Sequence, residues 1–149
     1  MEIRLEHKTM AVCHPEDLWE IFRQVEDWRD WTSTFGRSGW VHGEPWQPGS
    51  RFFIEIIQPR RIDLEVVILR CSAPHEVVLL CHGEGLAGEL WIHFMGEDWD
   101  RSNVSIEAAI VGTSKLPVPE LKSIINHIFH GWFEGLGLEA EKHCTTVAL

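Results

Sequence analysis

The segment from residue 117 to residue 143 constrains the fold most, because it alone carries a long helical pattern. Its apolar residues recur mostly three or four positions apart, which places them on one stripe of an α-helix. The stripe consists of Leu121, Ile124, Ile125, Ile128, Trp132 and Leu136. Pro119 suits the first helical turn, and Glu120 is favourable there. A helix about 37 Å long, at about 1.5 Å per residue, needs a broad apolar surface to bury this stripe.

Three glycines interrupt the helical segment, namely Gly131, Gly135 and Gly137. Each costs about 1 kcal/mol relative to alanine inside a helix, so another gain should offset it. Close approach of a strand, a kink or space for a ligand would each supply that gain. Close packing is the favoured explanation.

The N-terminal residues predict one strand followed by two short helices. Residues 2 to 11 alternate between apolar and charged side chains, as in a half-buried strand whose inner face carries Ile3, Leu5, His7, Thr9 and Ala11. Residues 14 to 17 then open a helix, with Pro15 near its first turn. A second helical piece follows from Asp27 to Thr34.

The middle of the chain, to about residue 113, has a strand-like pattern broken by tight turns. Strands are expected near residues 38–43, 51–58, 61–72, 77–82, 90–94 and 104–110. Consecutive short strands with tight turns form an antiparallel meander, because parallel strands need long crossovers. The prediction is an α+β fold in which a curved antiparallel sheet of six to seven strands wraps around the long C-terminal helix.

The length and the net charge of the chain limit which class of protein it can belong to. A chain of 149 residues fits one domain, and 13 basic against 23 acidic residues give a net charge of −10, which repels nucleic acid. No apolar run approaches the ~20 residues that cross a bilayer, so no membrane insertion is expected. The charged N-terminal residues do not resemble a signal peptide, so the expected location is cytoplasmic.

Cysteines and histidines suggest no cofactor. Cys13, Cys71, Cys81 and Cys144 are widely spaced and form no C-x-x-C pair, so reduced thiols are the simplest interpretation. Nine histidines occur, but no H-E-x-x-H or other metal-ligand spacing, so no metal is expected. The glycines at residues 83–88 have a dinucleotide-loop spacing but no following helix, which argues against a nucleotide cofactor.

Several local motifs, in this order, are similar to those of a known superfamily. They are residues 11–12 running into 15–22, residues 25–28 with Trp31, residues 48–52, Pro74 before a strand, and the long final helix. The chain resembles the polyketide cyclase/dehydrase and lipid-transport superfamily, the START-like (SRPBCC) proteins with the helix-grip fold. The likeness covers nearly the whole chain, so residues 1–149 are expected to form a single START-like ligand-binding domain.

The resemblance implies a deep, mostly apolar cavity between the concave sheet and the long helix. Members of the superfamily bind lipids, sterols, quinones, polyketides or hormones there, and some catalyse cyclisation or dehydration. Because members share a fold rather than one catalytic motif, no catalytic residue transfers by position. The resemblance therefore supports a pocket better than it supports a reaction.

Strand alternation selects two polar candidates for the pocket. His7 lies on the apolar face of the first strand, and Arg70 continues the inward alternation from Ile62 to Ile68. An inward imidazole could act as an acid or base, and an inward guanidinium could hold a ligand oxygen. The alternatives are a hydrogen-bonded core histidine and an arginine that reaches water at a strand end. The face of His82 is not decided by its apolar strand.

The leading hypothesis is a protein that binds a small hydrophobic molecule of lipid, polyketide or aromatic type. Its predicted ligand-binding residues are Trp31, Phe35, Trp40, Phe52, Ile54, Leu64, Val66, Arg70, Phe94, Ile106, Ala108, Ile125, Ile128 and Trp132. The alternative is a cyclase or dehydratase that uses His7 or Arg70 in the same cavity. A weaker alternative is a protein-interaction module. The sequence does not name the ligand, the reaction, the pathway or the oligomeric state.

Overall fold

A computed structural model describes residues 2–98, 100–112 and 115–148, with side chains as far as residue 144. Seven strands form one antiparallel sheet in the order β1-β7-β6-β5-β4-β3-β2. The strands are β1 (Glu2–Ala11), β2 (Phe35–His42), β3 (Arg51–Ile56), β4 (Ile62–Ser72), β5 (Glu76–Gly83), β6 (Leu86–Asp98) and β7 (Arg101–Gly112). The predicted antiparallel meander is confirmed for β2 to β7, and β1 forms one edge of the sheet by pairing with β7.

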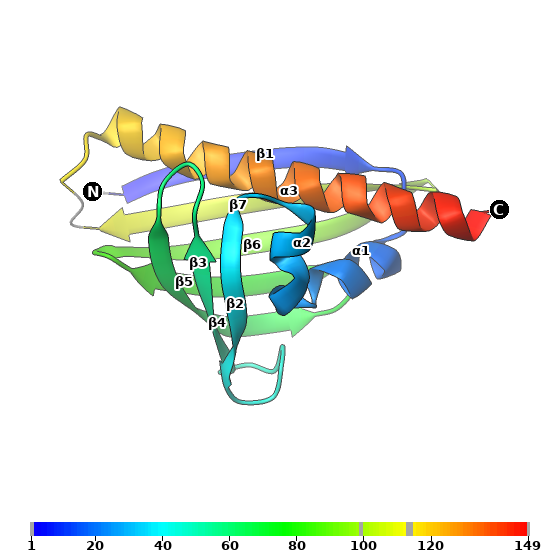
Figure 1. Ribbon diagram of the computed structural model, residues 1–149, viewed down its shortest axis with the longest axis horizontal. Helices are drawn as coiled ribbons and strands as arrows, with labels where there is room; N and C mark the ends of the chain where they lie inside the picture. The colour runs from blue at the N-terminus through cyan, green and yellow to red at the C-terminus, as the bar shows by residue number, and fades with distance from the viewer. Residues whose placement is uncertain (1, 99, 113–114, 149) are drawn as a thin grey trace.

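Two α-helices and a 3-10 turn connect β1 to β2, and one long helix ends the chain. They are α1 (Pro15–Phe22), η1 (Val25–Asp27), α2 (Trp28–Trp31) and α3 (Val118–Ala148). The sheet curves around α3, which crosses it, and α1 and α2 lie beside the C-terminal part of α3 (Figure 1). The predicted fold class is therefore confirmed. No helix among the described residues is long and apolar enough to span a bilayer.

The inner face of β1 follows the predicted alternation. Ile3 and Ala11 are fully buried, and Leu5, His7 and Thr9 are half-buried between them. This strand lies at an edge of the sheet and packs against α3, so its inward side chains face the helix. The inward polar residues of β1, His7 and Thr9, therefore lie where a strand and a helix from opposite ends of the chain meet.

Tryptophans anchor the short helices to the core. Trp28 Nε1 donates a hydrogen bond to the carbonyl of Phe22 at 2.7 Å, and Trp46 Nε1 donates one to the carbonyl of Arg23 at 2.8 Å. Both indoles are buried, so each donor is satisfied while its ring adds apolar area to the core. These contacts fix the segment before β2 and the β2–β3 loop against α1.

Two of the three glycines in α3 allow another segment to approach closely. A Cβ built at Gly135 would lie 2.9 Å from the carbonyl oxygen of Trp31 and 3.0 Å from Thr32 Cβ. Thr32 Oγ1 also donates a hydrogen bond to the carbonyl of Gly131 at 2.9 Å. The favoured explanation, close packing, is confirmed at these two positions, and the partner is the segment after α2. A Cβ at Gly137 would meet only ordinary contacts at 3.9 Å.

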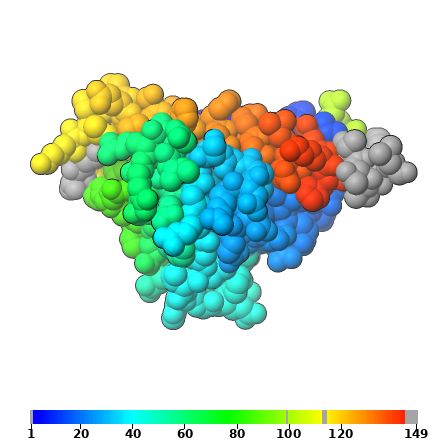
Figure 2. All heavy atoms as spheres, in the orientation of Figure 1, coloured from blue at the N-terminus to red at the C-terminus, as the bar shows by residue number. Residues whose placement is uncertain are grey.

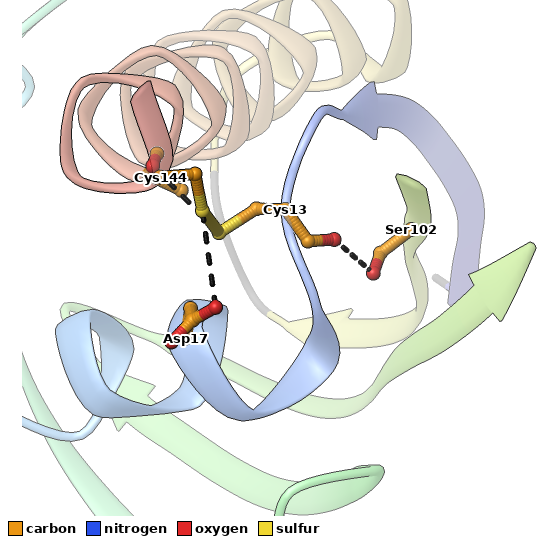
Figure 3. Close-up of a disulfide and its surroundings, with 5 residues drawn as sticks. Cys13, Asp17, Ser102 and Cys144 are labelled. Carbon is orange, nitrogen blue, oxygen red and sulfur yellow. Dashed lines mark hydrogen bonds between the residues drawn. A yellow bond between two sulfur atoms is a disulfide. The ribbon is translucent and has the colours of Figure 1, made fainter. Parts of the chain in front are cut away.

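A disulfide joins Cys13 to Cys144, so the expectation that all four cysteines are free thiols is wrong for this pair. Their Cα atoms are 5.9 Å apart across a sequence separation of 131 residues. Figure 3 shows the bond between the segment after β1 and the C-terminal end of α3, with Asp17 of α1 nearby. The pairing escaped prediction because α3 is longer than expected and carries Cys144 over α1. Cys71 and Cys81 are free.

Candidate ligand-binding site

A cavity of about 100 Å³ lies between the sheet and α3. Strands β2 to β7 supply one wall, and the apolar stripe of α3 supplies the other. The lining residues are Trp28, Phe35, Phe52, Ile54, Ile56, Ile62, Leu64, Val66, Leu79, Cys81, Leu86, Gly88, Leu90, Ile110, Leu121, Ile124, Ile125, Ile128, Phe129 and Trp132. On the face shown in Figure 2, the atoms of α3, β2, β3 and β4 meet in a continuous surface.

The lining is almost entirely hydrocarbon. Its thiol, Cys81, stays protonated because burial raises the pKa of this group to about 12. Trp132 Nε1 is buried and has no hydrogen-bond partner among the described residues. Leaving a buried donor unpaired costs free energy, so a hydrogen bond from this N–H to an acceptor atom of a ligand would stabilise the bound ligand. Among the described residues, the lining therefore offers apolar burial and at most a single indole donor, without an ionisable acid or base near neutral pH.

A second hollow adjoins the cavity at the N-terminal end of α3. Both are lined by Ile62, Leu86, Leu121 and Ile124. The outer hollow has a polar rim formed by Arg60 of the β3–β4 loop, Glu84 of the β5–β6 turn and Lys115. Glu84 is held in place because its Oε2 accepts a hydrogen bond from the backbone N–H of Asp63 at 2.8 Å. The cavity thus opens toward a rim that carries two cationic groups and one carboxylate.

The structure brings together part of the predicted ligand site. The predicted residues that line the cavity are Phe35, Phe52, Ile54, Leu64, Val66, Ile125, Ile128 and Trp132. Phe94, Ile106 and Ala108 are buried on the same face of the sheet but outside the cavity. Phe94, for example, packs against Phe22 of α1 with ring centroids 5.4 Å apart. The small helices fill this end of the sheet, which strand alternation does not reveal.

Two predicted tryptophans also lie outside the cavity. Trp40 packs against Trp46 and Phe52, with ring centroids 5.3 and 5.1 Å away. Trp31 lines a surface groove next to Gly135, at the C-terminal part of α3.

Arg70 does not point inward, so this part of the predicted site is wrong. The β4–β5 pairing shifts between Ile68 and Arg70, as in a β-bulge, and the extra residue resets the alternation. The Arg70 side chain is 61% exposed and pairs with Glu76. Cys71, rather than Arg70, returns to pack against the core. Of the two interpretations of Arg70, the arginine that reaches water is the one observed.

His7 points inward as predicted, but it lies apart from the cavity. Its side chain is 19% exposed and faces α3, where Nε2 is 3.7 Å from Glu134 Oε1. Burial lowers the pKa of His7 below its usual value of 6.5, and the negative charge of Glu134 opposes this shift only in part. His7 does not line the cavity, so its role as an acid or base on a cavity ligand has no support from position.

His82, whose face was undecided, lies on the outer face. Its side chain is 47% exposed, and Nε2 is 3.6 Å from Glu65 Oε1. Its neighbour Cys81 therefore points inward and lines the cavity.

Sequence reasoning missed several cavity residues. Leu79 and Cys81 belong to a fully apolar strand, whose inner face is set only by pairing with Ile68 and Val66 of β4. Leu121 and Ile124 were on the predicted helix stripe but not assigned to the site. Assigning the N-terminal part of that stripe to the site as well would have found them.

Known proteins resemble this chain in fold but not in sequence. No protein-family model matches the chain, and no curated protein matches it in sequence. A START superfamily protein from Mycobacterium smegmatis superposes with a TM-score of 0.80 at 10% identity, over 93% of this chain and 97% of that one. This chain has the START-like helix-grip fold.

Two further solved structures also superpose on nearly the whole chain. The ZhuI aromatase/cyclase from Streptomyces sp. R1128 superposes with a TM-score of 0.81 at 12% identity, over 97% of this chain and 96% of that one. Ara h 8.0201 superposes with a TM-score of 0.73 at 14% identity, over 94% and 98%. At these identities the likeness concerns the fold, and the site must be argued from this chain's own residues.

Proposed function

We propose that residues 1–149 form one domain that binds a small hydrophobic molecule in the cavity between the sheet and α3. The observation that carries the proposal is the hydrocarbon lining, to which six strands and two helices contribute. Removing apolar ligand surface from water contributes about 25 cal/mol per Å². A lining of this kind favours such ligands without selecting a charged one.

The cavity volume limits what can fit without movement of the walls. An engineered cavity of about 150 Å³ in another protein takes up benzene, so about 100 Å³ suits one aromatic ring or a short alkyl segment. A larger ligand would extend through the hollow at the N-terminal end of α3. Its outer part would then meet Arg60 and Lys115, which favour an anionic or strongly polar end. We therefore propose an amphipathic ligand with a compact apolar part.

The cyclase or dehydratase alternative requires an acid or base at the ligand. In the part of the chain that the structure describes, the cavity lining supplies only the Cys81 thiol, whose raised pKa makes it a poor proton donor or acceptor near pH 7. His7 and Arg70 both lie outside the lining. Hydrophobic binding therefore remains the better-supported proposal.

Native mass spectra of the purified protein, beside a denatured control from the same preparation, test occupancy directly. An extra non-covalent mass would identify the ligand class. A ligand-free preparation would then be titrated with the neutral dye N-phenyl-1-naphthylamine and with its sulfonated relative, 1-anilinonaphthalene-8-sulfonate. The dyes differ by a sulfonate, so the pair separates the apolar cavity from its cationic rim.

Two tryptophan substitutions on α3 provide the matched comparison. Ile124→Trp places a bulky ring at the junction of cavity and hollow, and it should weaken binding of both dyes at least tenfold. Leu138→Trp adds the same ring at a position that is 62% exposed, and it should leave both affinities unchanged. Arg60→Ala with Lys115→Ala should weaken only the sulfonated dye. If Ile124→Trp, with native circular dichroism, binds both dyes like the parent protein, the proposed cavity is not the binding site.

A further inference from the structure

The interface between β1 and α3 brings two histidines and a glutamate together, away from the apolar cavity. His130 and Glu134 are four residues apart on α3 and so lie on the same side of the helix. His7 comes from the inner face of β1, which packs against this side. One donor atom from each of the three residues lies within 4.8 Å of the other two. No helix motif predicts this group, because its third member comes from the other end of the chain.

The cluster is oriented by its surroundings. The rings of His7 and His130 are 5.9 Å apart and nearly perpendicular. Thr9 Oγ1, two residues along the same face of β1, donates a hydrogen bond to Glu134 Oε1 at 2.7 Å. Such outer contacts commonly hold a ligating carboxylate in position. His130 is exposed, so an ion can reach the group from solvent.

The unsatisfied atom of this cluster is His7 Nε2. It is buried and has no hydrogen-bond partner in the described part of the chain, because Glu134 Oε1 at 3.7 Å is too far to accept one. A bound cation would satisfy both the ring nitrogen and the carboxylate.

We propose that His7, His130 and Glu134 bind one Zn²⁺ ion at the junction of β1 and α3. Two imidazoles and a carboxylate form an established zinc donor set, which leaves a coordination position open to solvent. The three donor atoms would have to move closer together to form bonds of about 2.0–2.2 Å to one ion, and the exposed His130 side chain has the freedom to rotate toward His7 and Glu134. The net charge of −10 favours cation uptake. The bound ion would tie the edge strand to the long helix.

This site is separate from the proposed hydrophobic cavity, because none of its three residues lines the cavity. Zinc binding and dye binding are therefore tested separately, and the failure of one proposal leaves the other intact. Zinc binding here would contradict, at the interface of β1 and α3 alone, the expectation from sequence spacing that the chain binds no metal.

The test is calorimetric titration of the oxidised, chelator-treated protein with Zn²⁺ at pH 7.5. The oxidised protein is used because Cys13 and Cys144 would otherwise offer a second donor group beside Asp17. We expect one ion per chain with a micromolar or lower dissociation constant. Loss of an outer contact to a metal site typically costs about 10–100-fold in affinity, so loss of a ligand should cost at least about 100-fold.

Variants of α3 make the assignment specific. His130→Ala and Glu134→Gln should each weaken zinc binding at least about 100-fold while leaving far-ultraviolet circular dichroism unchanged. His127→Ala removes an exposed histidine of the same helix outside the cluster, and it should bind zinc like the parent protein. Zinc should also shift the side-chain ¹⁵N resonances of His7 and His130. Absence of stoichiometric binding below millimolar zinc, or unchanged affinity in His130→Ala, would overturn the proposal.

Discussion

The indole rings of Trp28 and Trp132 lie 5.0 Å apart, and both line the cavity, so the first residue of α2 and the middle of α3 form one aromatic wall. Trp132 is 5% exposed and also packs against Phe35. Trp132→Ala should therefore lower the free energy of unfolding by about 3–5 kcal/mol, as for other fully buried tryptophans. Urea denaturation would measure the loss.

Trp40→Ala is the matched control for this aromatic wall. Trp40 is only partly buried and does not line the cavity, so its removal should cost about half as much and leave dye affinity unchanged. Equal losses of stability in the two variants would contradict the view that the Trp28–Trp132 contact is central to the packing of α3.

Replacement by alanine should have opposite effects on stability at two glycines of α3, Gly135 and Gly137. Gly135→Ala should destabilise the protein by about 1–3 kcal/mol, because the new Cβ would crowd the carbonyl oxygen of Trp31 and the Cβ of Thr32. Gly137→Ala meets only ordinary contacts and should stabilise the helix by up to about 1 kcal/mol. Thermal unfolding of both variants checks the signs. A stabilised Gly135→Ala variant would show that the close approach of the α2–β2 segment is not required.

The disulfide should stabilise the fold because it closes a very long loop. Figure 3 shows Cys13 also held through its carbonyl, which accepts a hydrogen bond from Ser102 Oγ at 2.6 Å. Replacing Cys13 and Cys144 together by serine should lower the free energy of unfolding by about 2–5 kcal/mol. Urea denaturation with and without reductant measures this. Reductant should destabilise the parent protein and leave the double variant unchanged; an unchanged parent protein would argue that the disulfide adds no stability.

His7 should make the stability fall on mild acidification. Burial lowers its pKa in the folded protein, whereas the unfolded chain takes up a proton near pH 6.5. The unfolded state therefore binds more protons as the pH falls through 6.5, which costs stability until His7 is protonated in the folded state too. In chelator, the parent protein should lose more stability between pH 7.5 and 5 than His7→Gln does.

The same substitution at His127, which is exposed on α3, is the control for this pH effect. His127→Gln should retain the full acid sensitivity of the parent protein. If the stability of His7→Gln showed the same pH dependence as that of the parent protein and of His127→Gln, the acid sensitivity would have to come from other groups.

The chain's own periodicity was enough to predict the main elements of the fold. Alternation placed Ile3 and Ala11 on the inner face of β1, and the three-four spacing placed Ile125, Ile128 and Trp132 on the buried stripe of α3. These patterns are local, because a side chain's direction within a regular element depends only on its position in that element. The fold class followed from the order and turn lengths of the elements.

Only the tertiary structure decided which remote residues meet. A bulge turned Arg70 outward, the length of α3 brought Cys144 to Cys13, and the packing of β1 on α3 placed His7 beside Glu134. Sequence periodicity fixes directions within an element, but bulges, helix length and the crossing of α3 over the sheet set distances between elements. The full lining of the cavity and the histidine cluster depend on those distances, and they therefore became visible only in three dimensions.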